Sequence, residues 1–314
     1  MAVYGKSGHR PRRAHELKPR LVFDRLNPWV MFTYYIIALI MAMVFIRPIF
    51  LLSELAVIIA VNVLAGSAKQ TGLTLEGSLF MMVFIMVMNP LVNNRGTHII
   101  WTIGGTVITV ESVMYGLLMA LSLAVVMLVF VSYNRSFTSQ KFMSLFSKIS
   151  PQLTLLTMIT IRFVPLFLQR FKNIVQVQAI RGVSMSEGSL AKRGRAGMKL
   201  IEVLLVTSFY HALQTADSMT ARGYSDRKRT SYQRYRFTRH DGVILTVIGL
   251  ISAGCFIAAA RGVGRLVIYP SLGQIGLRSA ADWLVWAGVM VVDGLPLIIE
   301  GWEWLWWQLL KLKI

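Results

Sequence analysis

The 314-residue sequence is poor in cysteine, histidine and acidic side chains, and these shortages exclude several kinds of protein. Its single cysteine, Cys255, cannot form an intramolecular disulfide, and its apolar surroundings indicate a small core or lipid-facing residue. The five histidines include no His-x-x-x-His pair and none lies near the cysteine, so we expect no metal and no cofactor. The chain also lacks a Gly-x-x-x-x-Gly-Lys-[Ser/Thr] loop, so it cannot hold ATP in the P-loop manner.

Apolar residues, by contrast, are abundant. They make up 55% of the chain, charged residues make up only 15%, and the mean hydropathy is +0.59. These values lie outside the range of a soluble domain and predict an integral membrane protein. Lys and Arg number 33 against 14 acidic residues, a surplus that needs anionic partners such as lipid head groups, acidic protein surfaces or nucleic acid.

The apolar runs predict an all-α polytopic membrane protein. A span of the hydrocarbon core needs about 17 to 25 residues. Arg47-Pro48 separates the first two runs so closely that they must form a hairpin, because Pro48 favours a helix start. About six membrane helices are expected, at residues 29–46, 49–66, 77–92, 107–131, 242–260 and 282–299.

Basic residues give the expected orientation. Seven Lys or Arg precede residue 26, and this segment has no signal-peptide pattern, so the N-terminus is expected to be retained and cytoplasmic. Six crossings then place the C-terminus and residues 132–241 in the cytoplasm as well. The expected parts are a basic cytoplasmic N-terminal segment, membrane helices 1–4, a cytoplasmic or interfacial coupling region and C-terminal membrane helices, at residues 1–28, 29–131, 132–241 and 242–314.

The coupling region is too long for a loop and too apolar for a solvated tail. Between Arg162 and Arg239 it carries 15 basic and four acidic residues. Two segments, LTLLTMITIRFVPLFLQRFKNIVQVQAI and residues 197–221, have helical spacing of apolar residues, and Pro165 is a candidate kink in the first. Both begin apolar, and the second becomes polar toward its end. We expect long helices along or through the cytoplasmic interface, with their C-terminal ends exposed to the cytosol.

Each of these helices is followed by an Arg-Gly pair, in QAIRGV and in MTARGY. One interpretation is plain capping, because glycine commonly ends helices and arginine interacts favourably with the helix C-terminus. The other is that two rigid helix tips each present a guanidinium group to a carboxylate of a partner protein.

At these motifs the chain resembles the transmembrane T component (EcfT family) of energy-coupling factor (ECF) transporters. QAIRGV and MTARGY are similar to that family's paired X-Arg-X signatures. The segments NPLVNNRG and VITVESVMYGL are similar to its Asn-Pro-Leu and Thr-x-Glu-x-x-x-x-Gly segments. ISPQLTLLTMITIRFVPLF resembles the start of its long coupling helix, and LPLIIEGWEWLWWQLLKLKI resembles its C-terminal helix. The chain departs from the family's Leu-Asp-Pro-Arg-like stretch in RLNPWVMF, where Asn27 and Trp29 replace charged residues.

The resemblance implies a non-enzymatic coupling subunit of an ABC importer for vitamins or metal ions. Its implied partners are two ABC-type ATPase subunits, a membrane-embedded substrate-binding S component and the lipid bilayer, with no nucleic acid. Arg181 and Arg222 would each dock into a groove on one ATPase subunit. The residues expected to bind the ATPase subunits are Ile180, Arg181, Gly182, Ala221, Arg222 and Gly223.

Ionisable groups are costly in membrane runs, and the acidic residues in or beside such runs include Glu111, Asp293 and Glu300. We expect Glu111 and Glu300 at solvated helix ends. Asp293 lies deeper, and is expected either to make a polar contact inside the bundle or to be satisfied locally by the helix-breaking VVDGLP sequence.

Two other functions remain open from composition alone. A basic membrane enzyme acting on anionic lipids would need clustered catalytic carboxylates or histidines, and the sequence shows none. A membrane-tethered nucleic-acid binder would interleave aromatic and basic residues, as SYQRYRFTRH (231–240) does weakly.

Overall fold

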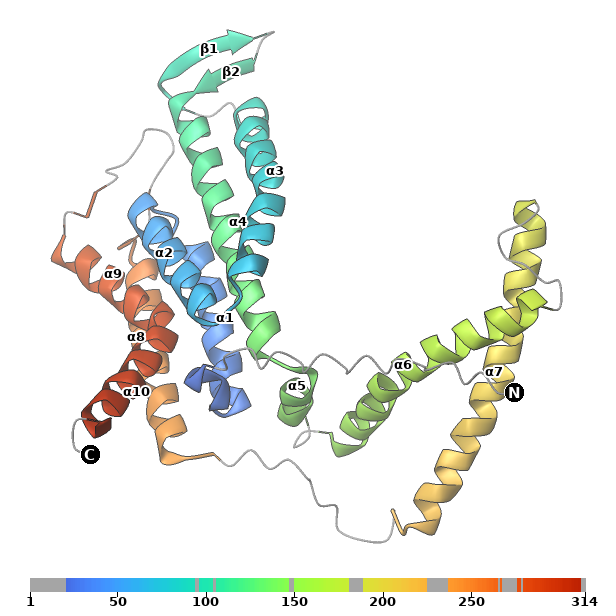
Figure 1. Ribbon diagram of the computed structural model, residues 1–314. Coiled ribbons are helices and arrows are strands. Elements are labelled where there is room, and N and C mark those ends of the chain that lie inside the picture. The colour runs from blue at the N-terminus through green and yellow to red at the C-terminus, as the bar shows by residue number, and fades with distance from the viewer. Residues whose placement is uncertain are drawn as a thin grey trace, which may run out of the picture. The chain divides into compact units, whose positions relative to one another are not determined.

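A computed structural model describes residues 21–93, 96–103, 106–146, 150–180, 189–224, 237–264, 266, 276–277 and 279–311. The chain divides into two compact units. The first unit combines residues 1–141 with 236–314, and the second comprises residues 142–235. The first unit is a bundle of apolar helices and the second contains two long helices (Figure 1).

The first unit is built almost entirely of helices, which confirms the all-α class. A short helix, α5 (Ser139–Phe146), lies at the division between the units. The described elements of the first unit are η1 (Val22–Arg25), α1 (Pro28–Val44), α2 (Pro48–Leu64), α3 (Ala68–Val92), β1 (Ile99–Ile103), β2 (Thr106–Thr109), α4 (Val110–Ser136), α8 (Arg239–Ala260), α9 (Ala280–Asp293) and α10 (Leu295–Lys311).

The β1–β2 hairpin lies where the sequence predicted a membrane helix from residue 107, and that boundary was wrong. The strands are antiparallel, with Ile103 opposite Thr106 and Thr102 opposite Val107. Threonine, valine and isoleucine suit a strand as well as a buried helix, so the apolar pattern did not distinguish the two. The helix begins only after Thr109, whose side chain accepts a hydrogen bond from the Ser112 N–H in a capping box. Figure 1 shows the hairpin at one end of the α3–α4 pair.

Length and composition identify five described helices that could cross a membrane, namely α3, α4, α8 and the two long helices of the second unit. The α9–α10 pair could form a sixth span, but it is bent by 64°. The predicted continuous helix over 282–299 is therefore broken, between Asp293 and Leu295. Gly294 ends α9, and a Cβ there would lie 2.7 Å from the Met290 carbonyl oxygen. At 17 residues each, α1 and α2 are shorter than the spans identified.

One end of the bundle is tied together by Arg47, in the turn between α1 and α2. Its guanidinium Nη1 lies 3.2 Å from Oδ1 of Asp282 in the first turn of α9. The backbone N–H of Gly264, after α8, donates to the same carboxylate oxygen at 3.1 Å. The predicted helical hairpin at Arg47-Pro48 is present, and its turn meets the C-terminal end of α8 and the N-terminal end of α9.

The opposite end is organised around the segment that precedes α1. The Val22 N–H donates to Glu300 Oε2 of α10 at 2.9 Å, so Glu300 makes a structural contact. Asn27 accepts a hydrogen bond from the Trp29 N–H and caps α1, while its own N–H donates to Asp241 Oδ1 at 3.2 Å. Asn27 therefore keeps a polar role without the charge of the family pattern.

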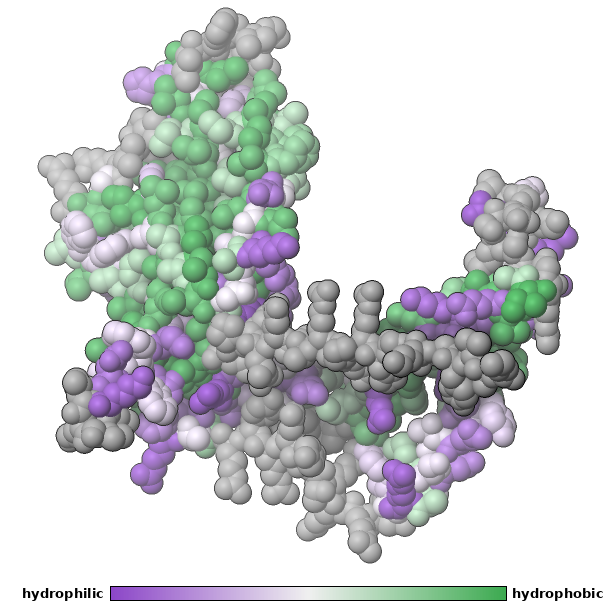
Figure 2. Space-filling model, viewed as in Figure 1, coloured by the Kyte–Doolittle hydropathy of each residue, from purple (hydrophilic) through white to green (hydrophobic). Residues whose placement is uncertain are grey.

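Lys141 anchors the chain at this same end, where it leaves the first unit. Its side chain is 9% exposed, and its ammonium group donates to the carbonyl oxygens of Asp24 at 2.7 Å and Ser136 at 2.9 Å. The other connection returns to the first unit just before α8, and Asp241 in the first turn of α8 accepts a hydrogen bond from the Asn27 N–H. Both connections to the second unit therefore start from the same end of the bundle. Most hydrophilic residues on the visible face of this unit gather at that end, and apolar residues cover most of the remainder (Figure 2).

Glu111, expected at a solvated helix end, is instead fully buried. Its carboxylate accepts hydrogen bonds from the Thr97 N–H and hydroxyl and from the His98 N–H, at 3.1 to 3.4 Å. Gly96 passes so close that a Cβ there would lie 2.6 Å from Thr109 Oγ1 and 2.7 Å from Glu111 Oε2. The segment after α3 is thus folded onto the start of α4 by a buried carboxylate.

The core of the first unit lies around α4, which packs against α1, α2 and α3. Gly116 lets α3 approach α4 closely, because a Cβ there would lie 3.1 Å from Asn89 Cβ. Cys255 of α8 is buried, as expected for a small residue of the core. Large side chains that are fully buried include Met31, Tyr34, Met41, Phe45, Phe50, Leu51, Leu118 and Leu128.

Candidate functional site

The second unit is built on two long helices, α6 (Pro151–Ile180) and α7 (Leu190–Ala221), which pack against each other. The first runs through Pro165 as a single helix. Leu200 is 1% exposed and is the most deeply buried described residue of the pair. We call α6 and α7 the coupling helices, after the region in which the sequence placed them.

Most apolar side chains of the coupling helices are exposed. A pair of helices in water would bury such residues against a third element. The large exposed apolar residues on α6 include Leu153, Leu156, Met158, Ile161, Val164, Leu168 and Ile180, and those on α7 include Met198, Leu205, Val206, Phe209 and Leu213. The surface is therefore suited to lipid or to a protein partner.

Hydroxyl side chains on these helices are satisfied within the helix itself. Thr157 and Thr160 of α6 donate to the carbonyl oxygens of Leu153 and Leu156, each at 2.8 Å. Four hydroxyls of α7 do the same, namely those of Thr207, Thr215, Ser218 and Thr220. Because these groups need no water, the helices can lie in an apolar setting despite their polar residues.

The C-terminal end of α7 is a well-defined capping structure. Gly223 adopts φ +68°, a left-handed conformation that glycine takes without a side-chain penalty. The Gly223 N–H donates to the Thr220 carbonyl at 2.9 Å, and the Tyr224 N–H donates to the Met219 carbonyl at 3.1 Å. This pair of bonds is the Schellman motif. The helix therefore ends sharply, and Arg222 is the capping residue that precedes the turn.

The structure describes four of the six predicted ATPase-binding residues. Ala221 and Arg222 are exposed at the end of α7, and Gly223 follows them in the turn. Ile180 is the last residue of α6 and is 88% exposed. Arg181 and Gly182 lie outside the described residues, as do residues 231–236 of the basic aromatic stretch.

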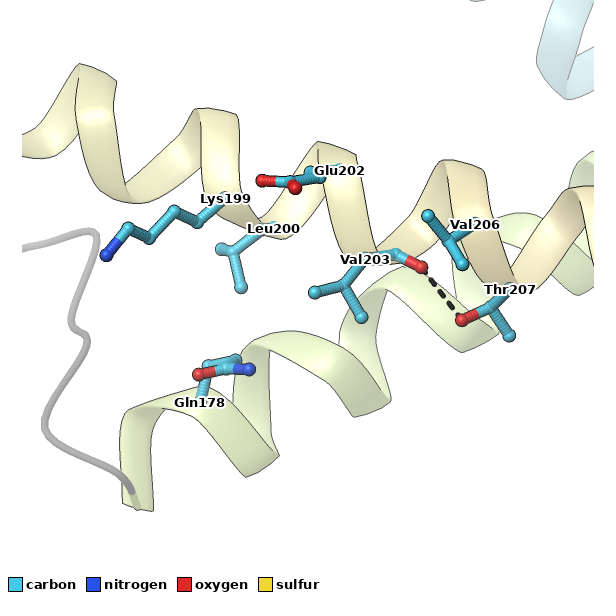
Figure 3. Close-up of a pocket in the computed structure, with 7 residues that line it drawn as sticks. All are labelled: Gln178, Lys199, Leu200, Glu202, Val203, Val206 and Thr207. Atoms are coloured by element: carbon cyan, nitrogen blue, oxygen red, sulfur yellow. Dashed lines mark hydrogen bonds between the residues drawn. The ribbon is translucent and has the colours of Figure 1, made fainter.

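A cavity of about 390 Å³ lies between the coupling helices (Figure 3). Gln178 borders it from α6, two residues before Ile180. Lys199 and Glu202 border it from α7, and its other lining residues are Leu200, Val203, Val206 and Thr207. The Thr207 hydroxyl donates back to the Val203 carbonyl and so does not reach across the cavity.

Within the described ranges, no group of three or more His, Cys, Asp or Glu side chains is placed to hold a metal ion. The coupling helices present instead exposed apolar side chains and several basic ones, including Arg162, Arg195 and Arg222.

Comparison with known proteins gives a consistent result. The cobalt transport protein (CbiQ) family matches residues 15–232. The chain is 28% identical over 262 residues to an energy-coupling factor transporter transmembrane protein EcfT of Bacillus selenitireducens, covering 77% of this chain and 94% of that protein. It is 25% identical over 195 residues to the Staphylococcus aureus protein of the same name, covering 59% and 72% of the two chains. For Limosilactobacillus fermentum EcfT, the identity is 32% over 108 residues, or 34% and 40% of the chains.

Proposed function

Because the chain belongs to the cobalt transport protein (CbiQ) family, as an energy-coupling transmembrane component of ECF transporters, we propose that it transmits ATP-driven motion between two other kinds of subunit. The driving partners are two ABC-type ATPase subunits. The driven partner is a membrane-embedded S component that binds a vitamin or a metal ion. The chain itself carries no catalytic site in this scheme.

The end of α7 is the observation that carries this proposal. A helix transmits a displacement only if its tip is held in a defined geometry, and the Schellman motif at Gly223 holds this one. Arg222 is exposed immediately before the turn, where its guanidinium can make a bidentate bond to an ATPase carboxylate. By its matching sequence, Arg181 is proposed to do the same at the end of α6, beside the exposed Ile180.

The exposed apolar residues of α6 and α7 are proposed to face lipid and the S component. The internally bonded hydroxyls support this placement, because those side chains need no water. We propose that both chain termini are cytoplasmic. Support comes from the seven basic residues before residue 26 and from the two connections to the coupling helices, which start at the same end of the bundle as the N-terminal segment.

Co-purification in mild detergent tests the proposal directly. We expect the tagged chain to retain two ATPase chains and a small membrane protein through a wash at high salt. The chain could instead retain nucleic acid that a high-salt wash removes, and no ATPase chain. That result would favour the nucleic-acid alternative and contradict the coupling role. Turnover of anionic lipid by the purified chain alone would contradict it equally.

Gly223 should matter through backbone conformation rather than through contact. Gly223→Val places a β-branched residue at φ +68°, which costs about 1–2 kcal/mol or more and disorders the turn that presents Arg222. Asparagine tolerates this conformation, so Gly223→Asn is the matched control. We expect Gly223→Val to weaken ATPase binding about tenfold, because a loss of about 1.4 kcal/mol corresponds to a tenfold lower affinity. Gly223→Asn should retain ATPase binding. Equal binding by the two variants, measured by titration in detergent, would contradict a role for the cap.

A further inference from the structure

Two carboxyl groups in the interior of the first unit lack the hydrogen bonds that buried charges require. Glu54, on α2, is 2% exposed, and Asp293, the last residue of α9, is 8% exposed. Within the part of the chain that the structure describes, both oxygens of Glu54 and Oδ1 of Asp293 have no hydrogen-bond partner. Asp293 was expected to make a polar contact inside the bundle. Glu54, a lone acid in the run PIFLLSELAVIIAVNVL, carries the same signal in the sequence.

The three other buried acidic residues of the described bundle all have donors. Glu111 accepts from the Thr97 and His98 segment, Asp241 accepts from the Thr238 N–H and hydroxyl at 2.9 and 2.8 Å, and Asp282 pairs with Arg47. The partly exposed Asp24 has one buried oxygen, Oδ1, without a donor. Among the buried acidic residues described, Glu54 is the one for which neither carboxylate oxygen has a donor.

Glu54 and Asp293 lie on α2 and α9, which pack against each other, and Asp293 acts electrostatically on Glu54. Two other titratable groups come from helices that pack against α9, namely Tyr34 of α1 and Cys255 of α8. The Tyr34 hydroxyl donates to the Asp293 backbone carbonyl at 2.9 Å, so it does not serve the carboxyl group. Neither carboxyl group has an ion pair with a basic residue among those described.

Ionising both groups would be unfavourable for two separate reasons. A carboxylate removed from water without a partner loses several kcal/mol of solvation. Two like charges in a medium of low polarity also repel each other.

We infer that Glu54 and Asp293 form a proton-binding site inside the helix bundle. A proton held by the pair removes a negative charge and supplies the O–H donor that the surrounding helices lack. Glu54 lies on α2, which packs against α9, and Asp293 ends α9 directly before the Gly294 bend, so a proton shared by the two carboxyl groups would help to hold the α9–α10 elbow against the bundle. The site needs no metal ligand set and no basic counter-ion.

Infrared spectroscopy of the purified protein at neutral pH tests this inference. Exposed carboxyl groups are ionised at this pH, so the carbonyl stretch of a protonated carboxylic acid reports only unusual sites. We expect the wild-type protein to show this band and to shift it in D₂O. The double variant Glu54→Gln/Asp293→Asn, which is neutral and similar in shape, should lose the band completely. Glu202→Gln removes an exposed carboxylate of α7 and should leave the band unchanged.

Identical wild-type and double-variant spectra in the carboxylic acid region would overturn the inference. So would a band that appears only when Na⁺ is withdrawn, because a cation would then occupy the site instead of a proton. If the double variant does not fold, as judged by size-exclusion chromatography, Glu54→Gln alone decides the question. An unchanged band in that single variant overturns the site, and a shifted or weakened band supports it.

Discussion

Replacing both tip arginines, in Arg181→Ala/Arg222→Ala, is expected to abolish transport and to prevent stable association with the ATPase subunits. A hydrogen-bonded contact between an arginine and a carboxylate contributes about 1.5–3 kcal/mol. Loss of two such contacts therefore lowers affinity by about a hundredfold to ten-thousandfold. Each single variant should weaken binding by a smaller factor, because one tip still engages. The measurement is ATPase pull-down from membranes, with substrate uptake into cells as the second readout.

The matched control removes the same amount of charge from elsewhere on the coupling helices. Arg162 of α6 and Arg195 of α7 are both exposed and lie far along their helices from the tips. Arg162→Ala/Arg195→Ala should therefore retain most ATPase binding. Normal pull-down by the Arg181→Ala/Arg222→Ala variant would contradict the docking role. Equal losses in both double variants would show instead that only the total positive charge matters.

Gly96→Ala is expected to have the largest effect on stability. Gly96 adopts φ +152°, and a Cβ there would lie 2.6 Å from Thr109 Oγ1 and 2.7 Å from Glu111 Oε2. Relief of this clash would separate Glu111 from its donors Thr97 and His98 and disturb the capping box that begins α4. We expect a loss of about 3 kcal/mol or more, from strain and overpacking together, and a melting temperature lower by about 5–10 °C in detergent.

Gly72→Ala is the control for this substitution. Gly72 lies within α3, and a Cβ there meets no atom within 4 Å. Alanine in a helix is favoured over glycine by about 0.5–1 kcal/mol, so this variant should be as stable as the wild type or slightly more stable. If Gly96→Ala and Gly72→Ala have the same melting temperature, the turn after α3 can relax without a loss of stability.

The candidate site was predictable to the extent that it depends on local physics. A helix end is determined by a few neighbouring residues, so Thr220, Arg222 and Gly223 alone indicate where α7 stops. The structure adds the bond from the Tyr224 N–H to the Met219 carbonyl and shows the turn that results. The partner of Arg222 remains a proposal because it belongs to another chain.

The β1–β2 hairpin shows where local patterns are insufficient. Residues 106–109 are as apolar as a membrane helix, and their sequence is compatible with either structure. Pairing with residues 99–103 and capping by Thr109 decide for the strand. The same holds for Glu111, which was expected at a solvated helix end. In the structure, the backbone N–H groups of Thr97 and His98 donate hydrogen bonds to its carboxylate.

Hydropathy, charge and helix-capping patterns alone predict a basic, all-α membrane protein with two long helices that are each followed by an Arg-Gly pair. These patterns depend on neighbouring residues, so they can be recognised without a fold. Which buried carboxyl groups have donors depends instead on the packing of distant segments. Glu111 obtains its donors from a turn 13 and 14 residues away, whereas Glu54 meets Asp293 from the far end of the chain and finds no donor. Long-range packing brings such groups together, and no local pattern records it.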